Sequence, residues 1–415
     1  MNQRAVLVGL NTGSDPENDS SEASLAELER LADTAGLVCV ATVLQSKHTY
    51  DSATFIGSGK VQEIALILEE TEADCVVLDH ELSGSQTKNL EAAWNCRVID
   101  RTFLILDIFA TRAKSREGKT QVELSQLRYL LPRLSGIGES LSRLGGGIGT
   151  RGPGETKLET DRRHIKRRIQ SLSNELEKIE KNRETQRKQR MQETVVQAAL
   201  VGYTNAGKSS LLNRLTNAGV LAEDRLFATL DPTVKRLTID ENEEILLVDT
   251  VGFVRKLPHH LVRAFRSTLE EVTVSDMILL VMDASDPNLE EQVRVTESLL
   301  RELDAEQQPR VYIYNKCDLI ENTDILPRRE NTVYLSCTTG AGVDELMDTL
   351  RRILPKKKRL MHLLFPYSDG QMLSRLHECA QIKSEEYTEK GTAVSAIVDA
   401  VDEKAFIPYE VEETE

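Results

Sequence analysis

The stretch VVQAALVGYTNAGKSSLLNRL, residues 195–215, decides the fold of the central part of the chain. An apolar run typical of a buried strand precedes a glycine-containing loop, and a run of helical periodicity follows it. The loop fits the pattern G-x-x-x-x-G-K-[ST], with Gly202, Gly207, Lys208 and Ser209 at its fixed positions. Strand, loop and helix in this order are typical of a phosphate-binding loop, where backbone N–H groups at a helix N-terminus surround an anion.

The side chains of this loop have distinct expected roles. We expect Lys208 to reach the β- and γ-phosphates and act in catalysis, and Ser209 to offer its hydroxyl to Mg²⁺. The other loop residues are expected to line the nucleotide: Gly202, Tyr203, Thr204, Asn205, Ala206, Gly207 and Ser210.

The motif DTVG, residues 249–252, follows an apolar strand-like run. Asp249 is placed to hold Mg²⁺, directly or through a water molecule. The backbone N–H of Gly252 can donate to the γ-phosphate and so sense it, which gives Gly252 a predicted catalytic role. Thr250 and Val251 complete the predicted contacts of this motif.

The segment LFATLDPT, residues 226–233, lies between the first helix and the next strand, where a mobile switch loop belongs. Thr229 is the favoured switch ligand of Mg²⁺ and a predicted catalytic residue, with Thr233 in reserve. The alternative is that these threonines only form turns. Four more residues of this loop are predicted GTP contacts: Phe227, Ala228, Leu230 and Asp231.

The motif NKCD, residues 315–318, predicts a guanine site. The Asp318 carboxylate can accept two N–H groups from guanine, whereas adenine lacks these donors and would leave the acceptor unpaired. Asn315 is expected to fix the neighbouring loop and can reach the base, and Lys316 and Cys317 between the two are also predicted GTP contacts. Backbone amides of a later segment, Ser336, Cys337 and Thr338, are expected near the guanine oxygen.

Phe253 follows DTVG directly, at a position where many phosphate-switch proteins carry a glutamine that orients the attacking water. A phenylalanine ring cannot orient water by hydrogen bonding. We therefore expect slow intrinsic hydrolysis that a partner accelerates.

Outward from this centre, the chain divides into four predicted segments. Residues 1–113 alternate strand-like and helix-like runs, which predicts an α/β unit with a parallel sheet. Residues 195–356 continue as a doubly wound GTPase sheet, and residues 357–415 read as a small α+β unit of strand, helix and strands. Within that last unit, QMLSRLHECAQI is read as helix and AVSAIVDAVDE as strand.

Residues 114–194 differ in pattern. Leucines at 124, 127, 131 and 134, and apolar residues at 165, 169, 172, 176 and 179, follow a coiled-coil period and predict an antiparallel helical hairpin. The glycine-rich loop between the two stripes predicts contact with phosphate-rich RNA, with a flexible linker as the alternative. The candidate RNA contacts are Arg143, Gly145, Gly146, Gly147, Gly149, Arg151, Arg162 and Arg163.

Composition sets limits on the class of protein. The 415 residues carry a net charge of −15, but residues 101–190 hold 21 lysines and arginines against 11 acidic residues, a local charge of +10. A basic segment in an acidic chain suggests one local contact with a polyanion, or equally a solvated helix surface. Six scattered cysteines without a C-x-x-C pattern, and no long apolar run, favour a cytoplasmic protein without a membrane span.

The chain resembles the HflX family of translation-associated GTPases, within the Obg/HflX group. The resemblance rests on GGGIGTRGPGETKLETDRRHI joined to VGYTNAGKSSLLNRLT, FATLDPT, DTVGFVRKLP and NKCD, and it spans nearly the whole chain. It implies a cytosolic GTPase that binds the large (50S) ribosomal subunit and inserts its glycine-rich hairpin into ribosomal RNA. Some members separate stalled ribosomes under stress. The family pattern assigns Mg²⁺ to the positions that are Ser209 and Thr229 here.

The leading hypothesis is therefore a ribosome-stimulated GTPase, expected to act as a monomer. Two alternatives stay open: a ribosome-biogenesis GTPase acting on subunit precursors, and an RNA-binding adaptor that reads GTP against GDP with negligible turnover. Related GTPases without the glutamine use an asparagine in the phosphate loop to help hold K⁺. Asn205 is either such a residue or a simple loop hydrogen-bonding group.

Overall fold

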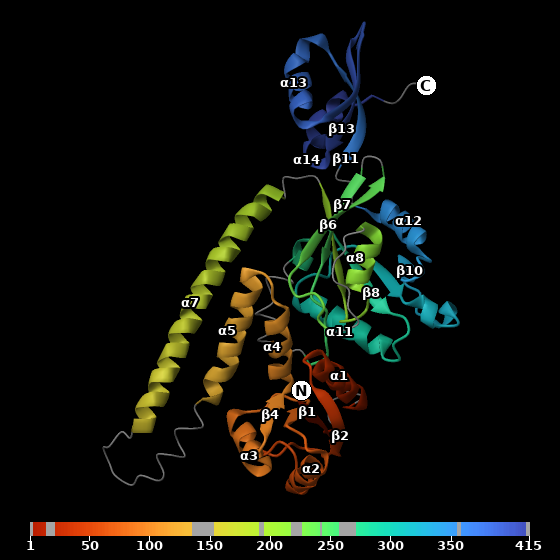
Figure 1. Cartoon of the computed structure of the whole chain (residues 1–415). Helices are drawn as coiled ribbons and strands as arrows, with labels where there is room; N and C mark the ends of the chain where they lie inside the picture. The colour runs from red at the N-terminus through yellow and green to blue at the C-terminus, as the bar shows by residue number, and fades with distance from the viewer. Residues whose placement is uncertain are drawn as a thin grey trace.

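The structure of the chain is a computed structural model that describes residues 3–13, 21–134, 153–190, 195–216, 226–240, 243–256, 271–354 and 358–411. Within these residues the strands form three sheets, and a pair of long helices projects beside them (Figure 1). No described helix is both long enough and apolar enough to cross a bilayer. No described helix or strand crosses residue 113, 194 or 356, where the predicted segments meet.

The first sheet has the strand order β2-β1-β3-β4, and all its pairings are parallel. This confirms the parallel sheet predicted from the βα alternation. Its elements are β1 (Arg4–Asn11), α1 (Ser21–Thr34), β2 (Val38–Ser46), α2 (Ser58–Thr71), β3 (Cys75–Leu78), α3 (Gly84–Trp94), β4 (Arg97–Asp100) and α4 (Arg101–Arg112).

The helical hairpin consists of α5 (Arg116–Arg133) and α7 (Pro153–Arg190), which lie side by side in Figure 1. Arg116 pairs with Glu175 at 2.8 Å, and Glu123 pairs with Arg168 at 2.6 Å. Partner numbers on α7 fall as those on α5 rise, so the two helices run antiparallel, as predicted. Among the predicted seam residues, Leu124 and Leu172 are buried.

The central sheet has the order β10-β9-β8-β5-β7-β6, in which only β6 is antiparallel to its neighbour. This is the doubly wound arrangement expected from the sequence. Its elements are β5 (Val196–Gly202), α8 (Lys208–Thr216), β6 (Thr233–Asp240), β7 (Glu243–Asp249), β8 (Met277–Asp283), α11 (Leu289–Glu302), β9 (Arg310–Asn315), β10 (Thr332–Tyr334) and α12 (Val343–Ile353).

The C-terminal sheet is antiparallel, in the order β11-β13-β12, and differs from the prediction in two places. The helix ends earlier than predicted, because the backbone of Ala380 is extended and leads directly into β12. The run AVDE, predicted as strand, opens helix α14. The elements are β11 (Lys358–Phe365), α13 (Gly370–Cys379), β12 (Gln381–Thr388), β13 (Gly391–Asp399) and α14 (Ala400–Phe406).

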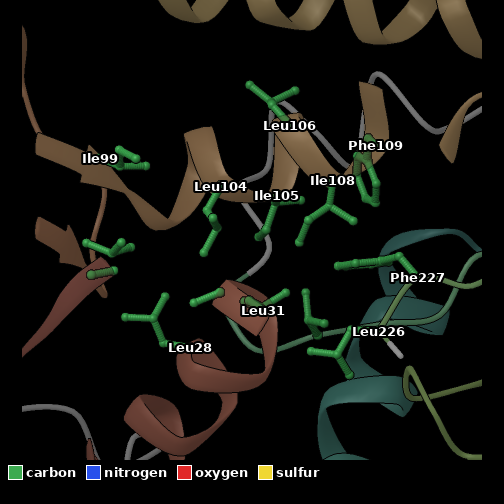
Figure 2. Packing of buried hydrophobic residues seen from close by; sticks show 14 of the residues in the cluster. Leu28, Leu31, Ile99, Leu104, Ile105, Leu106, Ile108, Phe109, Leu226 and Phe227 are labelled. Atoms are coloured by element: carbon green, nitrogen blue, oxygen red, sulfur yellow. The ribbon is translucent and has the colours of Figure 1, made fainter. Parts of the chain in front are cut away.

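One apolar core joins the first sheet's helices to the central segment. Phe109 of α4 meets Phe227 edge to face, with ring centroids 4.6 Å apart (Figure 2). Burial of large apolar side chains is the main favourable term in folding, so this shared core holds the two segments together. Its members include Leu28, Leu31, Leu104, Ile105, Ile108, Leu226, Leu230, Val251 and Val254.

Candidate nucleotide site

Two glycines shape the loop between β5 and α8. A Cβ atom at Gly202 would lie 2.0 Å from the carbonyl oxygen of Val281, and one at Gly207 would lie 2.2 Å from Asn315 Nδ2. Their φ angles are 155° and 94°, values that residues with side chains rarely adopt. Both positions therefore require glycine, and the loop can run close against β8 and Asn315.

Lys208, the first residue of α8, is only 6% exposed. Its ammonium group donates to the carbonyl oxygens of Gly202 at 3.1 Å and Tyr203 at 2.9 Å. Burial lowers the pKa of Lys208 to about 8, and the Asp249 carboxylate opposes this shift. A buried cation gains from an incoming anion, because the anion favours its charged form.

Three oxygen-bearing side chains converge beside the start of α8, and we call them the Ser209–Thr229–Asp249 cluster. The Ser209 hydroxyl lies 2.8 Å from Thr229 Oγ1 and donates to Asp249 Oδ2 at 2.6 Å. Thr233 begins β6 instead and pairs with Asp249 in the sheet ladder. Of the two candidate switch threonines, Thr229 is the one whose hydroxyl has a hydrogen-bonding contact with Ser209.

Asp249 is fully buried at the end of β7. Burial raises the pKa of its carboxyl group, and the Lys208 ammonium opposes that effect. Its Oδ1 atom has no hydrogen-bond partner among the described residues. A buried acceptor without a donor is costly, and hydroxyl and carboxylate oxygens are the ligands that Mg²⁺ prefers. The donor set therefore fits a bound Mg²⁺ ion.

A hollow opens between these elements. A Cβ atom at Gly252 would lie 2.6 Å from the Cα of Thr204 and 2.9 Å from Lys208 Nζ, so the DTVG turn presses against the phosphate loop. Most predicted phosphate-side residues line this hollow: Thr204, Asn205, Gly207, Lys208, Ser209, Ser210, Phe227, Ala228, Thr229, Thr250 and Gly252.

Asn315 links the phosphate loop to the predicted base site. It ends β9 and is 2% exposed. Its Nδ2 donates to the carbonyl oxygen of Ala206 at 2.9 Å, and its Oδ1 accepts from the backbone N–H of Cys337 at 3.1 Å. The Asn315 side chain thus joins the phosphate loop to the loop that contains Cys337.

The other predicted base-site residues flank Asn315. Lys316, with a φ of 64°, pairs with Asp283 at 2.6 Å. Asp318 is exposed in the short 3₁₀ helix Cys317–Leu319, while Ser336 is buried and Thr338 exposed in the neighbouring loop. An exposed carboxylate beside a rigid loop is available to a ligand.

Phe253 is 1% exposed, and its side chain belongs to the apolar core that includes Val201, Ile278 and Leu280. Its backbone carbonyl accepts from the N–H of Thr204 at 2.8 Å. The residue after DTVG thus fastens this segment to the phosphate loop and is absent from the lining of the hollow.

Seven predicted phosphate-side contacts are absent from that lining: Gly202, Tyr203, Ala206, Asp249, Leu230, Asp231 and Val251. Leu230 and Val251 are buried in the core shared with α1 and α4. Asp231 accepts hydrogen bonds from the backbone N–H groups of Lys114 and Ser115, at 2.9 and 2.8 Å. The side chains of Leu230, Asp231 and Val251 therefore contact the first segment or the hairpin.

Most of the predicted RNA contacts, Arg143 through Arg151, lie outside the described residues. Arg162 and Arg163 lie on α7, where Arg163 is exposed and Arg162 half-buried.

A buried polar network joins the first segment to the nucleotide loops, and sequence reasoning missed it. Glu27 on α1 pairs with Arg101 and accepts from the Tyr203 hydroxyl and, at 3.1 Å, from the backbone N–H of Arg255. Arg101 also donates to Asp79 Oδ1 at 2.7 Å. A lone acidic residue on a helix is usually solvent-exposed, so the sequence carries no local signal for this network.

Three families match successive parts of the chain. Residues 22–110 match the family described as GTP-binding GTPase N-terminal, and residues 112–190 match GTP-binding GTPase Middle Region. Residues 197–316 match the family described as 50S ribosome-binding GTPase.

Whole-chain relatives agree with these matches. The chain is 48% identical over 397 residues to GTPase HflX of Caldanaerobacter subterraneus subsp. tengcongensis, covering 95% of this chain and 91% of that protein. It is 43% identical over 397 residues to GTPase HflX of Escherichia coli K12, covering 94% and 92%. This likeness, together with a phosphate loop and a guanine motif on one sheet, shows that the chain belongs to the HflX family of GTPases, which hydrolyse GTP.

Proposed function

We propose that this GTPase depends on Mg²⁺, is stimulated by the large ribosomal subunit, and separates stalled ribosomes into subunits under stress. The match to a 50S ribosome-binding GTPase family supports the ribosomal partner. The buried Phe253 side chain supports the proposed stimulation by the subunit, because it offers no hydrogen-bonding group to orient the attacking water. We further propose that the protein acts as a monomer in the cytoplasm.

The Ser209–Thr229–Asp249 cluster supports the Mg²⁺ site. The hydroxyls of Ser209 and Thr229 would hold the ion, with Asp249 bonding to it directly or through a water molecule. When bound, Mg²⁺ neutralises charge on the phosphate oxygens. The γ-phosphate would strengthen this position of Thr229 through the shared ion, which makes the switch loop a sensor of the triphosphate.

Lys208 and Gly252 supply the remaining contacts to the transferred phosphoryl group. Lys208 would exchange the carbonyl oxygens of Gly202 and Tyr203 for β- and γ-phosphate oxygens. The backbone N–H of Gly252 would donate to the γ-phosphate.

Guanine would be read by Asp318, with Asn315 holding the loop beneath it and the backbone of Ser336 to Thr338 near the guanine oxygen. The support is the hydrogen bond that the backbone N–H of Cys337 donates to Asn315 Oδ1, which joins these two loops. Specificity then follows from an acceptor that adenine would leave unpaired.

The glycine-rich loop and Arg162 and Arg163 of α7 would contact ribosomal RNA. Backbone N–H groups and arginines are suited to phosphates, and recognition of this kind depends on shape more than on base sequence. GTP turnover would then time the release of the subunit.

The deciding experiment measures GTP hydrolysis by the full chain with and without purified 50S subunits, and follows 70S ribosomes by sedimentation with GTP, GDP and a non-hydrolysable analogue. We expect low basal turnover, a large rise with 50S subunits, and loss of 70S ribosomes with the triphosphate forms. An unchanged rate across several salt concentrations contradicts the stimulation. Tighter binding to precursor subunits than to mature ones favours the biogenesis role, and no turnover on ribosomes favours the adaptor.

Asn205 lines the hollow with a φ of 62°. We propose that a K⁺ ion binds near Asn205 as a second cation, since the chain lacks the glutamine that follows DxxG in many phosphate-switch proteins. Hydrolysis measured in equal concentrations of KCl and NaCl tests this assignment, and equal rates leave Asn205 as a loop hydrogen-bonding residue.

A further inference from the structure

We propose that Asp231 is a positioning residue for GTP hydrolysis, which fixes the switch-loop segment carrying Thr229 against the N-terminus of α5. This inference rests on the proposed role of Thr229 in holding Mg²⁺. It assigns to the carboxylate of Asp231 a contact with the helical hairpin in place of a contact with the nucleotide.

The contacts of Asp231 are those of a carboxylate seated on a helix N-terminus. Its Oδ2 accepts from the backbone N–H groups of Lys114 and Ser115, at 2.9 and 2.8 Å, and its Oδ1 accepts from the Ser115 hydroxyl. Ser115 is the N-cap of α5, and its hydroxyl also accepts from the N–H of Gly118 at 2.9 Å. Hydrogen bonds to an ionised carboxylate are among the strong ones, and the helix dipole adds to them.

Gly118 makes this close approach possible. A Cβ atom there would lie 2.6 Å from Asp231 Oδ1, well inside van der Waals contact. Gly118 is in the first turn of α5 and has no positive φ. On helix propensity alone, alanine would be more favourable than glycine at this position. We infer that glycine is needed here because it leaves room for the Asp231 carboxylate.

A second anchor lies on the other side of Thr229. The backbone N–H of Phe227 donates to Thr204 Oγ1 at 2.8 Å, and its ring packs on Phe109 of α4. Phe227 has a φ of 55°, a conformation that costs free energy and persists only where the surroundings enforce it. Figure 2 shows this ring entering the core between the two segments.

Thr229 is therefore two residues from an anchor on each side. Two residues span at most about 7 Å, so a shift of either anchor moves the threonine hydroxyl away from Ser209. Release of Asp231 from α5 would misplace Thr229 and leave the phosphate loop and base site intact. Because α5 is paired with α7, the same contact ties the position of Thr229 to the hairpin.

The test uses the full chain with Asp231→Ala, Asp231→Asn and Gly118→Ala. Gly118→Ala keeps every hydrogen-bonding group and displaces Asp231 by steric contact alone. The matched control is Gly59→Ala, in the first turn of α2, where no atom lies within 4 Å of the added Cβ. The measured quantities are kcat and KM for GTP, the Mg²⁺ concentration for half-maximal rate, and GDP affinity.

We expect Asp231→Ala and Gly118→Ala each to lower kcat by about tenfold and to raise the Mg²⁺ requirement, because a displacement near 1 Å has effects of this size or larger. Asp231→Asn recovers part of the rate, since its amide oxygen can still accept from the two N–H groups. GDP affinity and the control stay at the wild-type value. The double variant Asp231→Ala with Gly118→Ala is no slower than Asp231→Ala alone.

Two results overturn the inference: kcat within twofold of wild type in both Asp231→Ala and Gly118→Ala, or an equal loss of GTP and GDP affinity, which marks a purely structural role. Thr229→Ala separates this failure from that of the proposed Mg²⁺ site. If Thr229→Ala is slow while Asp231→Ala is not, only the inference fails. If Thr229→Ala is also fast, the assignment of Thr229 to Mg²⁺ fails with it.

Discussion

At the scale of single residues, the nucleotide site contains buried charged groups with few hydrogen-bonding partners among the described residues. Among the described residues, Lys208 donates to two carbonyl oxygens and lies near Asp249, whose own Oδ1 lacks a donor there. Each group is costly to bury alone, and each would be satisfied by the phosphates and the metal ion that the site is proposed to hold. The free protein is therefore prepared for its ligand by groups that gain most when it binds.

The first prediction concerns Lys208 and pH. Its pKa is lowered to about 8 in the free protein, and bound phosphates favour its charged form. As pH rises above 8, binding must take up a proton, so GDP affinity should fall by up to about tenfold between pH 8 and pH 9 and stay flat below pH 7. Calorimetric titration across this range measures it.

Lys208→Arg is the matched variant for that experiment, because an arginine keeps its charge throughout. Its affinity is expected to change only as much as ionisation of guanine itself requires. Equal slopes in the two proteins would show that Lys208 is not the titrating group.

The second prediction concerns the base site. Asp318→Asn should shift nucleotide preference from GTP toward xanthosine triphosphate, because the amide N–H can donate to the 2-oxo group of xanthine where the carboxylate cannot. Affinity for both nucleotides, measured by competition with a fluorescent analogue, checks it. Unchanged GTP affinity in this variant contradicts the assignment of Asp318.

At the scale of elements, the hairpin is held by cross-helix pairs that are largely exposed. Arg116–Glu175 and Arg168–Glu123 lie at the surface, where such pairs contribute little to stability. Leu124 and Leu172 are buried, and burial of apolar side chains contributes more to stability than exposed ion pairs do. The ion pairs join the two helices in their antiparallel arrangement.

The third prediction concerns the loop that joins these helices. Removing residues 145–154 should weaken stimulation by 50S subunits and leave basal hydrolysis nearly unchanged, because the nucleotide site is built from other segments. Hydrolysis with and without subunits measures both quantities. A Gly-Ser segment of the same length is the control that separates the effect of sequence from that of length; loss of nucleotide binding on deletion would show that the loop supports the fold.

At the scale of the whole molecule, the first segment is part of the nucleotide machinery. Glu27 and Arg101 reach the phosphate loop through the Tyr203 hydroxyl and reach the segment after DTVG through the backbone of Arg255. Lys256, the next residue, pairs with Asp79 at 2.7 Å. The carboxyl ends of parallel strands are where such sheets usually bind ligands, and here residues of the central segment occupy that edge near β3.

The fourth prediction concerns this network. Glu27→Ala removes one of the two buried carboxylates that pair with Arg101 and leaves the Tyr203 hydroxyl without its acceptor, so the free energy of unfolding should fall by about 3–5 kcal/mol. Urea denaturation of the nucleotide-free protein measures it. Glu244→Ala, which breaks an exposed pair with Arg236 at 3.2 Å, is the control and should cost less than about 1 kcal/mol. A comparable small loss in Glu27→Ala would show that the network is not coupled.

The sequence predicted the sheets and the nucleotide loops well because each rests on a short run of neighbouring residues. Buried strands such as β8 are continuous apolar runs, and the phosphate loop is a fixed spacing of glycines, lysine and serine. The C-terminal unit was harder to read. The run AVDE extends the alternation of β13 but opens a helix, and α13 ends where the backbone of Ala380 becomes extended, a change that the apolar pattern does not mark.

The sequence by itself determined that this protein binds a nucleotide, that the base is guanine, and that Phe253 orients no water, because these properties belong to local motifs. Only the tertiary structure decided that Asp231 seats on α5 and that Glu27 bonds to Tyr203. These partners are 116 and 176 residues apart, and the contacts exist because folding places one segment's charge beside another segment's unpaired donors. No periodicity or spacing along the chain encodes a pairing over that distance.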